Sequence, residues 1–341
     1  MLTVQTNISL KPYNTFGIDV NARYWAEITH ETDLLALLNT PDYSTIPRLV
    51  LGGGSNVLLT QEFDGMVIKM NIQGIRITRE DDQHVYLEVG AGVNWHELVM
   101  YCVANGLAGM ENLSLIPGTT GAAPMQNIGA YGVEIEQIFD SLTAVQGQTG
   151  ESRRFSHADC RFGYRESVFK HDLKGQYIIT AVTFRLDKQQ TFHTRYGAIQ
   201  ETLTDMGITD ESLSIKAVSD AVIRIRRSKL PDPDEIGNAG SFFKNPEIST
   251  ARFDRLKAQF PGLPGYPLGD ERVKVPAGWL IEQSGWKGKR VGDAGVHAKQ
   301  ALVLVNYGTA TGNDIIAIAR QVQKTIDTMF GIQLTPEVNV V

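Results

Sequence analysis

Hydrophobic and polar residues alternate in short blocks along this chain, and the spacing changes from block to block. Val85–Val89 has the alternation of a half-buried strand, and Asn94–Ala104 has the apolar spacing of a helix that Asn94 caps and Gly106 follows. Further strands are predicted at Arg48–Leu51, Val57–Leu59, Met66–Met70, Ser141–Val145, Tyr177–Leu186 and Gln333–Val341. Further helices are predicted at Thr32–Leu38, Ser219–Lys229, Thr250–Phe260, Pro276–Ser284 and Asn313–Phe330, with Ser219 and Asn313 as caps.

The order of these elements indicates an α+β fold. Strands and helices follow one another without a steady strand–helix–strand repeat, which argues against a doubly wound sheet. A chain of 341 residues has room for about two domains. The turn-rich residues 231–240 place a boundary near residues 215–235.

Composition and charge narrow the class of protein. The chain is 42% hydrophobic and 21% charged, as ordinary globular proteins are, and its net charge of −6 argues against nucleic-acid binding. Two cysteines and seven histidines show no disulfide or metal-site spacing, so no metal is expected. The N-terminus does not resemble a signal peptide, and no apolar run reaches the roughly 18 residues of a membrane span. These features predict a cytoplasmic enzyme without a membrane partner.

Two glycine-rich segments are the first sign of a ligand. Residues 52–56, GGGSN, follow a predicted strand, but they match neither a Walker A loop nor G-x-G-x-x-G, so a tight hairpin turn is the favoured interpretation of this segment taken alone. Residues 116–132, IPGTTGAAPMQNIGAYG, form a second segment that is too rich in glycine for regular structure and too apolar for a disordered linker. Together the two could hold a dinucleotide diphosphate between backbone N–H groups.

Five motifs in order make the interpretation specific. GGGSN (52–56) and IPGTTGAAPMQNIGAYG (116–132) are followed by RFGYRESVF (161–169), GNAGSFFKNP (237–246) and PEV (336–338). This ordered set resembles the UDP-N-acetylenolpyruvoylglucosamine reductase family over essentially the whole chain. TRYG (194–197) resembles the form of the family that has an extra tyrosine-bearing loop.

The resemblance implies a fold and its cofactors. It implies the two-subdomain FAD-binding fold of the vanillyl-alcohol oxidase (p-cresol methylhydroxylase) type, with a separate α+β substrate-binding domain. The expected division is 1–70 and 71–220 for the FAD subdomains, 221–330 for the substrate domain and 331–341 for a C-terminal strand that returns to the active site. It implies NADPH as reductant and UDP-N-acetylglucosamine enolpyruvate as substrate, with a hydride from flavin N5 to C3. The glycine-rich loop 116–132 lacks His and Cys, so FAD is expected to be non-covalent, and a monomer is expected.

Three residues acquire catalytic roles by this resemblance. Ser241 is expected to give a proton to C2, although an isolated serine in such a segment is more often a polar turn residue or a cap. Arg165 is expected to polarise the substrate carboxylate, as a planar guanidinium can, rather than form a surface ion pair. Glu337 is expected to assist at the enolate, although its pattern alone indicates an exposed carboxylate near a chain end.

The remaining site residues are also carried over from the family. The predicted cofactor-binding residues are Gly52, Gly53, Gly54, Ser55, Asn56, Pro117, Gly118, Thr119, Gly121, Ala122, Asn127, Gly129 and Ala130. The predicted substrate-binding residues are Tyr131, Tyr164, Tyr196, Lys229, Asn245 and Gln300. The basic stretch 224–229 is otherwise interpreted as a helix C-terminus, where cations meet the helix dipole favourably.

Two other functions remain open at this point. One is an FAD-dependent sugar or alcohol oxidase or dehydrogenase of the same fold, which the GSFFKNP and PEV segments argue against. The other is a non-catalytic nucleotide-sugar-binding protein, which would be colourless and could not be reconstituted with FAD.

Overall fold

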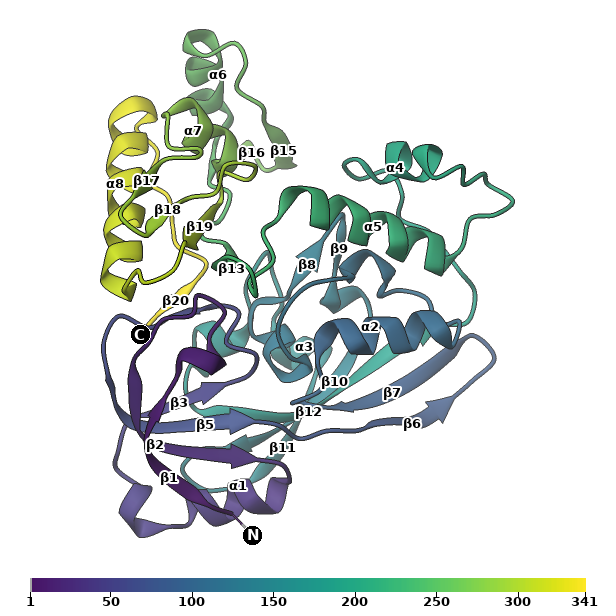
Figure 1. Ribbon diagram of the computed structural model, residues 1–341. Helices are drawn as coiled ribbons and strands as arrows, with labels where there is room; N and C mark the ends of the chain where they lie inside the picture. The colour runs from purple at the N-terminus through teal and green to yellow at the C-terminus, as the bar shows by residue number, and fades with distance from the viewer. Residues whose placement is uncertain (1) are drawn as a thin grey trace. The chain divides into compact units, whose positions relative to one another are not determined.

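A computed structural model describes residues 2–341, and these residues form two compact units (Figure 1). The first unit holds residues 2–8, 22–53 and 64–228. The second holds residues 9–21, 54–63 and 229–341, so the chain enters it three times. Helices and strands are mixed in both units, which confirms the predicted α+β class. None of the helices in residues 2–341 combines the length and the apolar character needed to cross a membrane.

The first unit is built on two main sheets. One has the strand order β1-β2-β5-β3, from Val4–Ser9, Asn21–Ile28, Phe63–Met70 and Arg48–Leu51. The other has the order β11-β10-β12-β7-β6, from Ser152–Ser156, Phe139–Gln146, Tyr177–Asp187, His84–Gly90 and Ile75–Glu80. All neighbouring strands of the second sheet are antiparallel. A small hairpin, β8 (Gly129–Ala130) with β9 (Val133–Glu134), begins at the end of the second glycine-rich segment.

Helices cover these sheets through their apolar faces. In Figure 1, α2 (Trp95–Ala104) lies across the second sheet, and Trp95, Leu98 and Val99 are buried there. α1 (Glu31–Leu38) buries its leucines against the first sheet. The other helices of this unit are α3 (His157–Cys160), α4 (Ile199–Asp205), α5 (Ile215–Lys229) and the 3-10 turns η2 (Pro41–Tyr43), η3 (Glu111–Leu113), η4 (Thr120–Gln126), η5 (Ile135–Gln137) and η6 (Val168–Lys170).

The second unit has a central sheet of order β13-β19-β18-β17, from Gly237–Ser241, Val303–Asn306, Ala294–Val296 and Arg290–Val291. A smaller sheet is formed by β14 (Glu247–Ser249), β16 (Arg272–Lys274) and β15 (Tyr266–Gly269). Its helices are α6 (Thr250–Gln259), α7 (Ala277–Gln283), α8 (Gly312–Phe330) and the 3-10 turn η1 (Lys11–Tyr13). β20 (Asn339–Val340) pairs in parallel with β4 (Val57–Leu58), which brings the last residues beside the segment after GGGSN.

Several predicted elements were wrong in detail. α5 begins at Ile215 instead of Ser219, and Ser219 lies buried inside it with its hydroxyl 2.8 Å from that of Ser114. Thr311 caps α8 instead of Asn313, because Asp314 completes a capping box with it. Most of the predicted strand 333–341 is irregular: β20 is paired with β4, and Pro336 forms an isolated bridge with Phe243.

The second glycine-rich segment also departs from its prediction. Despite its glycines it contains regular structure, since η4 and β8 lie in it. The 3-10 turn η4 contains Pro124, and Asn127 ends it in the left-handed conformation (φ 44°).

Candidate active site

In the first unit, Gly52 and Gly53 of the first glycine-rich segment closely approach residues 118–119 of the second. A Cβ atom on Gly53 would lie 2.7 Å from Gly118 Cα, and one on Gly52 would overlap the Thr119 hydroxyl. Real Cβ atoms do not come this close, so glycine is required at both positions. The Lys69 ammonium, from β5, donates a hydrogen bond to the Gly52 carbonyl and so restrains the first segment. Lys69 could not be predicted from the sequence, because a single lysine in a strand forms no motif.

Thr119 lies at this contact, and its side-chain hydroxyl forms no hydrogen bond within residues 2–341. The residue is 9% exposed. Buried hydroxyls are nearly always paired in native proteins, so an unpaired one at a glycine-lined contact indicates a place for a ligand. Gly121, the next predicted cofactor residue, packs its backbone against Ala91. Pro117 and Ala122 are exposed beside it.

The turn that follows is fixed by the side chain of Asn127, which is fully buried. Its amide nitrogen donates to Glu134 Oε2 at 3.0 Å and to the Gly163 carbonyl at 3.1 Å. Its amide oxygen accepts from the backbone N–H of Glu136 at 3.1 Å. The Asn127 side chain therefore organises this loop from inside, whereas Gly129 and Ala130 remain half-buried.

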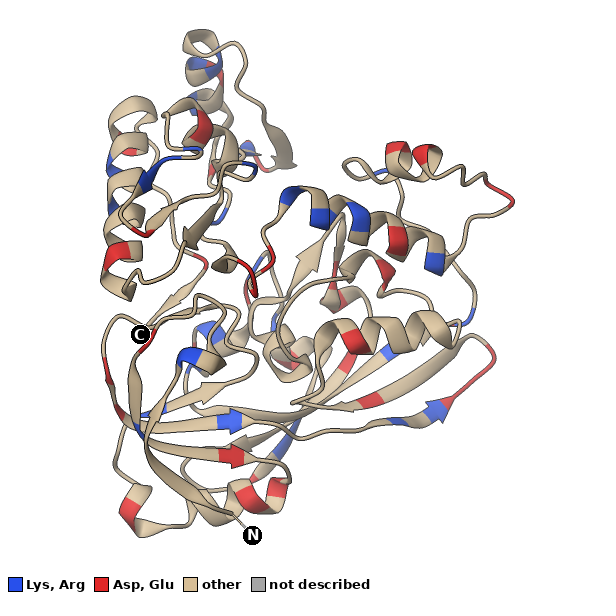
Figure 2. Ribbon diagram, viewed as in Figure 1, with Lys and Arg blue, Asp and Glu red and all other residues tan. Residues whose placement is uncertain are grey.

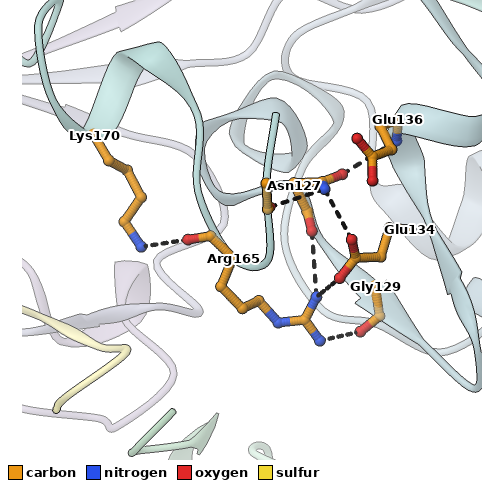
Figure 3. A network of polar contacts seen from close by, with 7 residues as sticks. Asn127, Gly129, Glu134, Glu136, Arg165 and Lys170 are labelled. Atoms are coloured by element: carbon orange, nitrogen blue, oxygen red, sulfur yellow. Dashed lines mark hydrogen bonds and ion pairs between the residues drawn. The ribbon is translucent and has the colours of Figure 1, made fainter. Parts of the chain in front are cut away.

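Arg165 is joined to the same turn (Figure 3). Its Nη1 donates to Glu134 Oε1 at 3.3 Å and to the Asn127 carbonyl at 3.2 Å, and its Nη2 donates to the Gly129 carbonyl. The guanidinium also lies 5.4 Å from the ring centroid of Tyr164. Arg165 has a left-handed backbone (φ 56°) in a tight β-bridge between Gly163 and Glu166. Glu134 was missed by the sequence analysis, because its importance depends on a partner that follows it by 31 residues.

Tyr131 and Tyr196 are also brought together in this unit. A Cβ on Gly132 would lie 3.2 Å from Tyr196 Cβ, so the tyrosine-bearing loop rests on the turn after Tyr131. The amide of Asn112 donates to the carbonyls of Tyr131 at 3.1 Å and His193 at 2.8 Å and connects the two segments. The Tyr196 ring is 60% exposed, as a ligand-contacting side chain on a loop can be.

Arg226 belongs to the basic stretch 224–229 that was interpreted as a helix C-terminus, but its guanidinium lies beside the Tyr131 phenol. Burial raises the pKa of the Tyr131 phenol, and the Arg226 guanidinium beside it opposes that rise. Arg226 Nε donates to the Leu115 carbonyl at 3.2 Å. Its position four residues after Val222, on the apolar face of α5, is the signal that could have indicated a buried cation. Figure 2 shows Lys and Arg gathered along the C-terminal half of α5.

In the second unit the segments of Ser241 and Glu337 are adjacent. Ser241 is the exposed last residue of β13 and follows Gly240, which has φ 69°. The next residue, Phe242, accepts the backbone N–H of Glu337 at 2.8 Å. The Asn56 amide donates to the Glu337 carbonyl at 3.4 Å, so the GGGSN segment reaches the same place.

The other predicted substrate-binding residues of this unit differ in their contacts and exposure. Asn245 Oδ1 accepts the backbone N–H of Ala277 at 2.9 Å and so satisfies the start of α7. Gln300 Oε1 accepts from Leu302 N–H at 3.4 Å, in the turn before β19. Lys229 is exposed at the end of α5. No cluster of His, Cys, Asp or Glu in residues 2–341 has the arrangement of a metal site.

Known proteins resemble this chain over its full length. A protein of Amoebophilus asiaticus described as UDP-N-acetylenolpyruvoylglucosamine reductase is 53% identical over 340 residues, which is 100% of both chains. Reductases of the same description from Burkholderia multivorans (53% identity, 96% of this chain and 94% of the relative) and Pseudomonas putida (50%, 98% and 98%) agree. The chain belongs to the UDP-N-acetylenolpyruvoylglucosamine reductase family.

Family profiles and solved structures complete the assignment. The profile of the UDP-N-acetylenolpyruvoylglucosamine reductase C-terminal domain matches residues 232–341, and that of an FAD binding domain matches residues 22–156. The fold is similar to that of the reductase MurB from Thermus caldophilus (TM-score 0.69, 24% identity, 100% of this chain and 99% of that one). It is also similar to p-cresol methylhydroxylase (TM-score 0.50, 12% identity, 96% and 84%).

The predicted family and fold are therefore confirmed. As a member of the UDP-N-acetylenolpyruvoylglucosamine reductase family, the chain is an FAD-dependent oxidoreductase with the FAD-binding fold of the p-cresol methylhydroxylase type. The predicted roles of individual residues and the predicted domain boundaries stay predictions.

Proposed function

We propose that this chain is a cytoplasmic, monomeric enzyme that reduces UDP-N-acetylglucosamine enolpyruvate to UDP-N-acetylmuramate with NADPH. This reaction would be a step of peptidoglycan biosynthesis. The full-length identity to reductases of that description carries the proposal. The five motifs that suggested the family from sequence lie within the matched length. Nucleic acid and membrane are not expected partners, because the net charge is −6 and the substrate is a small anion.

The contact of the two glycine-rich segments is suited to FAD. It offers an unpaired buried hydroxyl on Thr119 and a close backbone approach of Gly53 to Gly118. Uncharged donors of this kind bind a diphosphate without requiring a basic surface. The residues proposed to hold FAD non-covalently are the glycine-rich sets 52–56 and 117–130 named above. When bound and reduced by NADPH, FAD supplies the hydride that reaches C3 of the substrate.

The chain itself supplies the proton and stabilises charge. Ser241 gives its hydroxyl proton to C2, where a strongly basic carbanion allows a weak acid to serve. Arg165 polarises the substrate carboxylate, so that charge arriving at C2 spreads onto oxygen. Glu337 assists enolate stabilisation, and the adjacency of its segment to Phe242 supports a shared location with Ser241. Tyr131, Tyr164, Tyr196, Lys229, Asn245 and Gln300 bind the nucleotide sugar.

The decisive experiment follows the colour of the protein. The purified chain should show flavin absorption, lose it with NADPH and regain it with the enolpyruvyl sugar in the absence of O₂. An oxidase of the same fold would regain colour with O₂ and ignore the enolpyruvyl sugar, and a colourless protein that cannot take up FAD would support a binding protein. Flavin that stays with acid-precipitated protein would contradict non-covalent binding.

Ser241→Ala tests the proton donor. The variant should still be reduced by NADPH, but reoxidation by the enolpyruvyl sugar should slow by roughly 10²–10⁴-fold. Ser152→Ala, which changes an exposed serine of β11, is the matched control and should react at the wild-type rate. Reoxidation of Ser241→Ala at that same rate would refute the assignment.

A further inference from the structure

The Arg165 guanidinium is restrained by one carboxylate and two carbonyl oxygens (Figure 3). Glu134 provides the carboxylate, and residues 127 and 129 provide the carbonyls. The side chains of Arg165 and Glu134 are 18% and 24% exposed, so the pair is only partly screened by water. Three contacts from one turn fix both the position and the plane of the guanidinium.

Glu134 divides its two oxygens between two donors. Oε1 accepts from Arg165 and Oε2 accepts from the Asn127 amide. Asn127 cannot turn its amide around, because its nitrogen also donates to the Gly163 carbonyl and its oxygen accepts from Glu136 N–H. Two donors therefore face residue 134, and only a carboxylate presents an acceptor to each of them.

The backbone around this pair is shaped for it. Asn127 and Arg165 both have positive φ, at 44° and 56°, which costs non-glycine residues free energy unless the surroundings impose it. A Cβ on Gly129 would lie 2.6 Å from Glu134 Cγ and 2.9 Å from Arg165 Nη1. Glycine at 129 thus permits the ion pair to sit against the turn.

We propose that Glu134 is a positioning residue that orients Arg165 for catalysis, with Asn127 fixing the second oxygen of Glu134. The inference rests on the proposed function, in which Arg165 meets the substrate carboxylate. Without Glu134 the guanidinium keeps its charge but loses its fixed plane, and misplacement of a catalytic donor slows the reaction. Because the removed group is an anion near a site for an anionic substrate, its loss should slow the reaction without weakening binding.

The test is a double-mutant cycle of Glu134→Gln and Arg165→Met, measured on pre-reduced enzyme mixed with the enolpyruvyl sugar. Glu134→Gln should slow flavin reoxidation by roughly 10- to 100-fold, with the KM for the enolpyruvyl sugar unchanged or lowered. In the Arg165→Met background, Glu134→Gln should cause no further loss, because the group it orients is gone. Glu136→Gln is the matched control, since its carboxylate takes no part in the network and only its backbone N–H does.

A second measurement does not depend on turnover. In ¹⁵N NMR spectra of the holoenzyme, the Arg165 guanidinium signals should indicate slow rotation about the Cζ–N bonds, and Glu134→Gln should speed that rotation. If Glu134→Gln does not fold, Glu134→Asp takes its place in both measurements, because it shortens the carboxylate and should give the same changes to a lesser degree.

The possible results distinguish a failure of the positioning role from a failure of the proposed function. Additive losses in the cycle, a raised KM, or Arg165 signals that Glu134→Gln does not change would overturn the positioning role. Wild-type enzyme that the enolpyruvyl sugar fails to reoxidise would reject the proposed function instead, and the NMR comparison would still report whether Glu134 restrains Arg165.

Discussion

At the scale of single residues, backbone conformation decides what the glycine-rich segments can do. Gly53 lets the first segment touch Gly118 of the second, and the unpaired Thr119 hydroxyl lies beside that contact. The sequence pattern predicted two segments acting together, because clustered glycines indicate close approach. It could not predict which glycine meets which, because that depends on the packing of strands far apart in the chain.

Gly53→Ala should therefore weaken FAD binding. The new Cβ would lie 2.7 Å from Gly118 Cα, and overpacking of this kind costs about 1–3 kcal/mol. Because this strain opposes the close approach of the two segments that would hold FAD, the Kd for FAD should rise by roughly 10- to 100-fold. Titration of apoprotein with FAD measures it. Gly262→Ala is the control, because its nearest neighbour would be 3.8 Å away, and equal affinities of the two variants would contradict the prediction.

Leu115, at the entrance to the second glycine-rich segment, is held in a rare conformation (φ 59°). Its N–H donates to His96 Nδ1 at 3.0 Å, and its carbonyl accepts from Arg226. Burial, followed by Arg227 and Arg226, lowers the pKa of His96 below its usual 6.5, while Glu97 raises it. A protonated His96 has no lone pair for Leu115 N–H, so the neutral ring is required.

This lowered pKa predicts a pH dependence of stability. The unfolded chain binds the His96 proton more readily than the folded one, so the folded state is fully favoured above about pH 6.5 and loses stability as pH falls through the lowered folded pKa. His96→Gln keeps an acceptor but cannot titrate there. The Tm of the wild type should fall more than that of His96→Gln between about pH 7 and 5. Parallel curves would show that His96 does not contribute.

At the scale of elements, apolar spacing located the main helices, but their ends needed more information. The cores of α1, α2, α6 and α8 lie where the spacing predicted them. The start of α5 was set too late because Ser219 looks like a cap, whereas it pairs with Ser114 inside the core. Short edge strands such as β1, β6 and β11 were missed, because their exposed faces give little hydrophobic signal.

The N-terminus of α8 gives a direct test of cap identity. Thr311 Oγ1 accepts from Asp314 N–H, whereas the side chain of Asn313 donates to the Thr60 carbonyl. Thr311→Ala should lower the free energy of unfolding by about 1 kcal/mol. Asn313→Ala should change it by less than about 0.5 kcal/mol, as surface changes do. Urea unfolding monitored by circular dichroism measures both, and a larger loss for Asn313→Ala would restore the original cap prediction.

At the scale of the whole molecule, the chain does not divide into consecutive domains. GGGSN is split between the two units, since Gly53 belongs to the first and Gly54 to the second. The predicted boundaries near residues 70, 220 and 330 stay predictions, and sequence patterns carry no information on which distant strands pair. The residues proposed to be catalytic are distributed in the same way, with Arg165 in the first unit and Ser241 and Glu337 in the second. Their roles could be predicted only through the family resemblance.

The pairing of β20 with β4 should stabilise the segment that follows GGGSN. Val341 N–H donates to the Leu58 carbonyl at 2.9 Å, and its own carbonyl accepts from Thr60 N–H at 2.7 Å. Val341→Pro removes the first of these donors, at a cost of about 1 kcal/mol. Amide hydrogen exchange of residues 57–60 should accelerate, whereas Val341→Ala, which retains the N–H, should leave it near the wild-type rate. Equal exchange in the two variants would contradict the prediction.

The same pairing has a consequence for the order of biosynthesis. The residues of β4 leave the ribosome early, but the strand they pair with is synthesised some 280 residues later. Until residues 339–340 are synthesised, the backbone N–H and C=O groups of Val57 and Leu58 lack their strand partner, and the apolar side chains of these residues are exposed. The nascent chain therefore keeps Asn56 and its neighbours without their final pairing until synthesis is nearly complete.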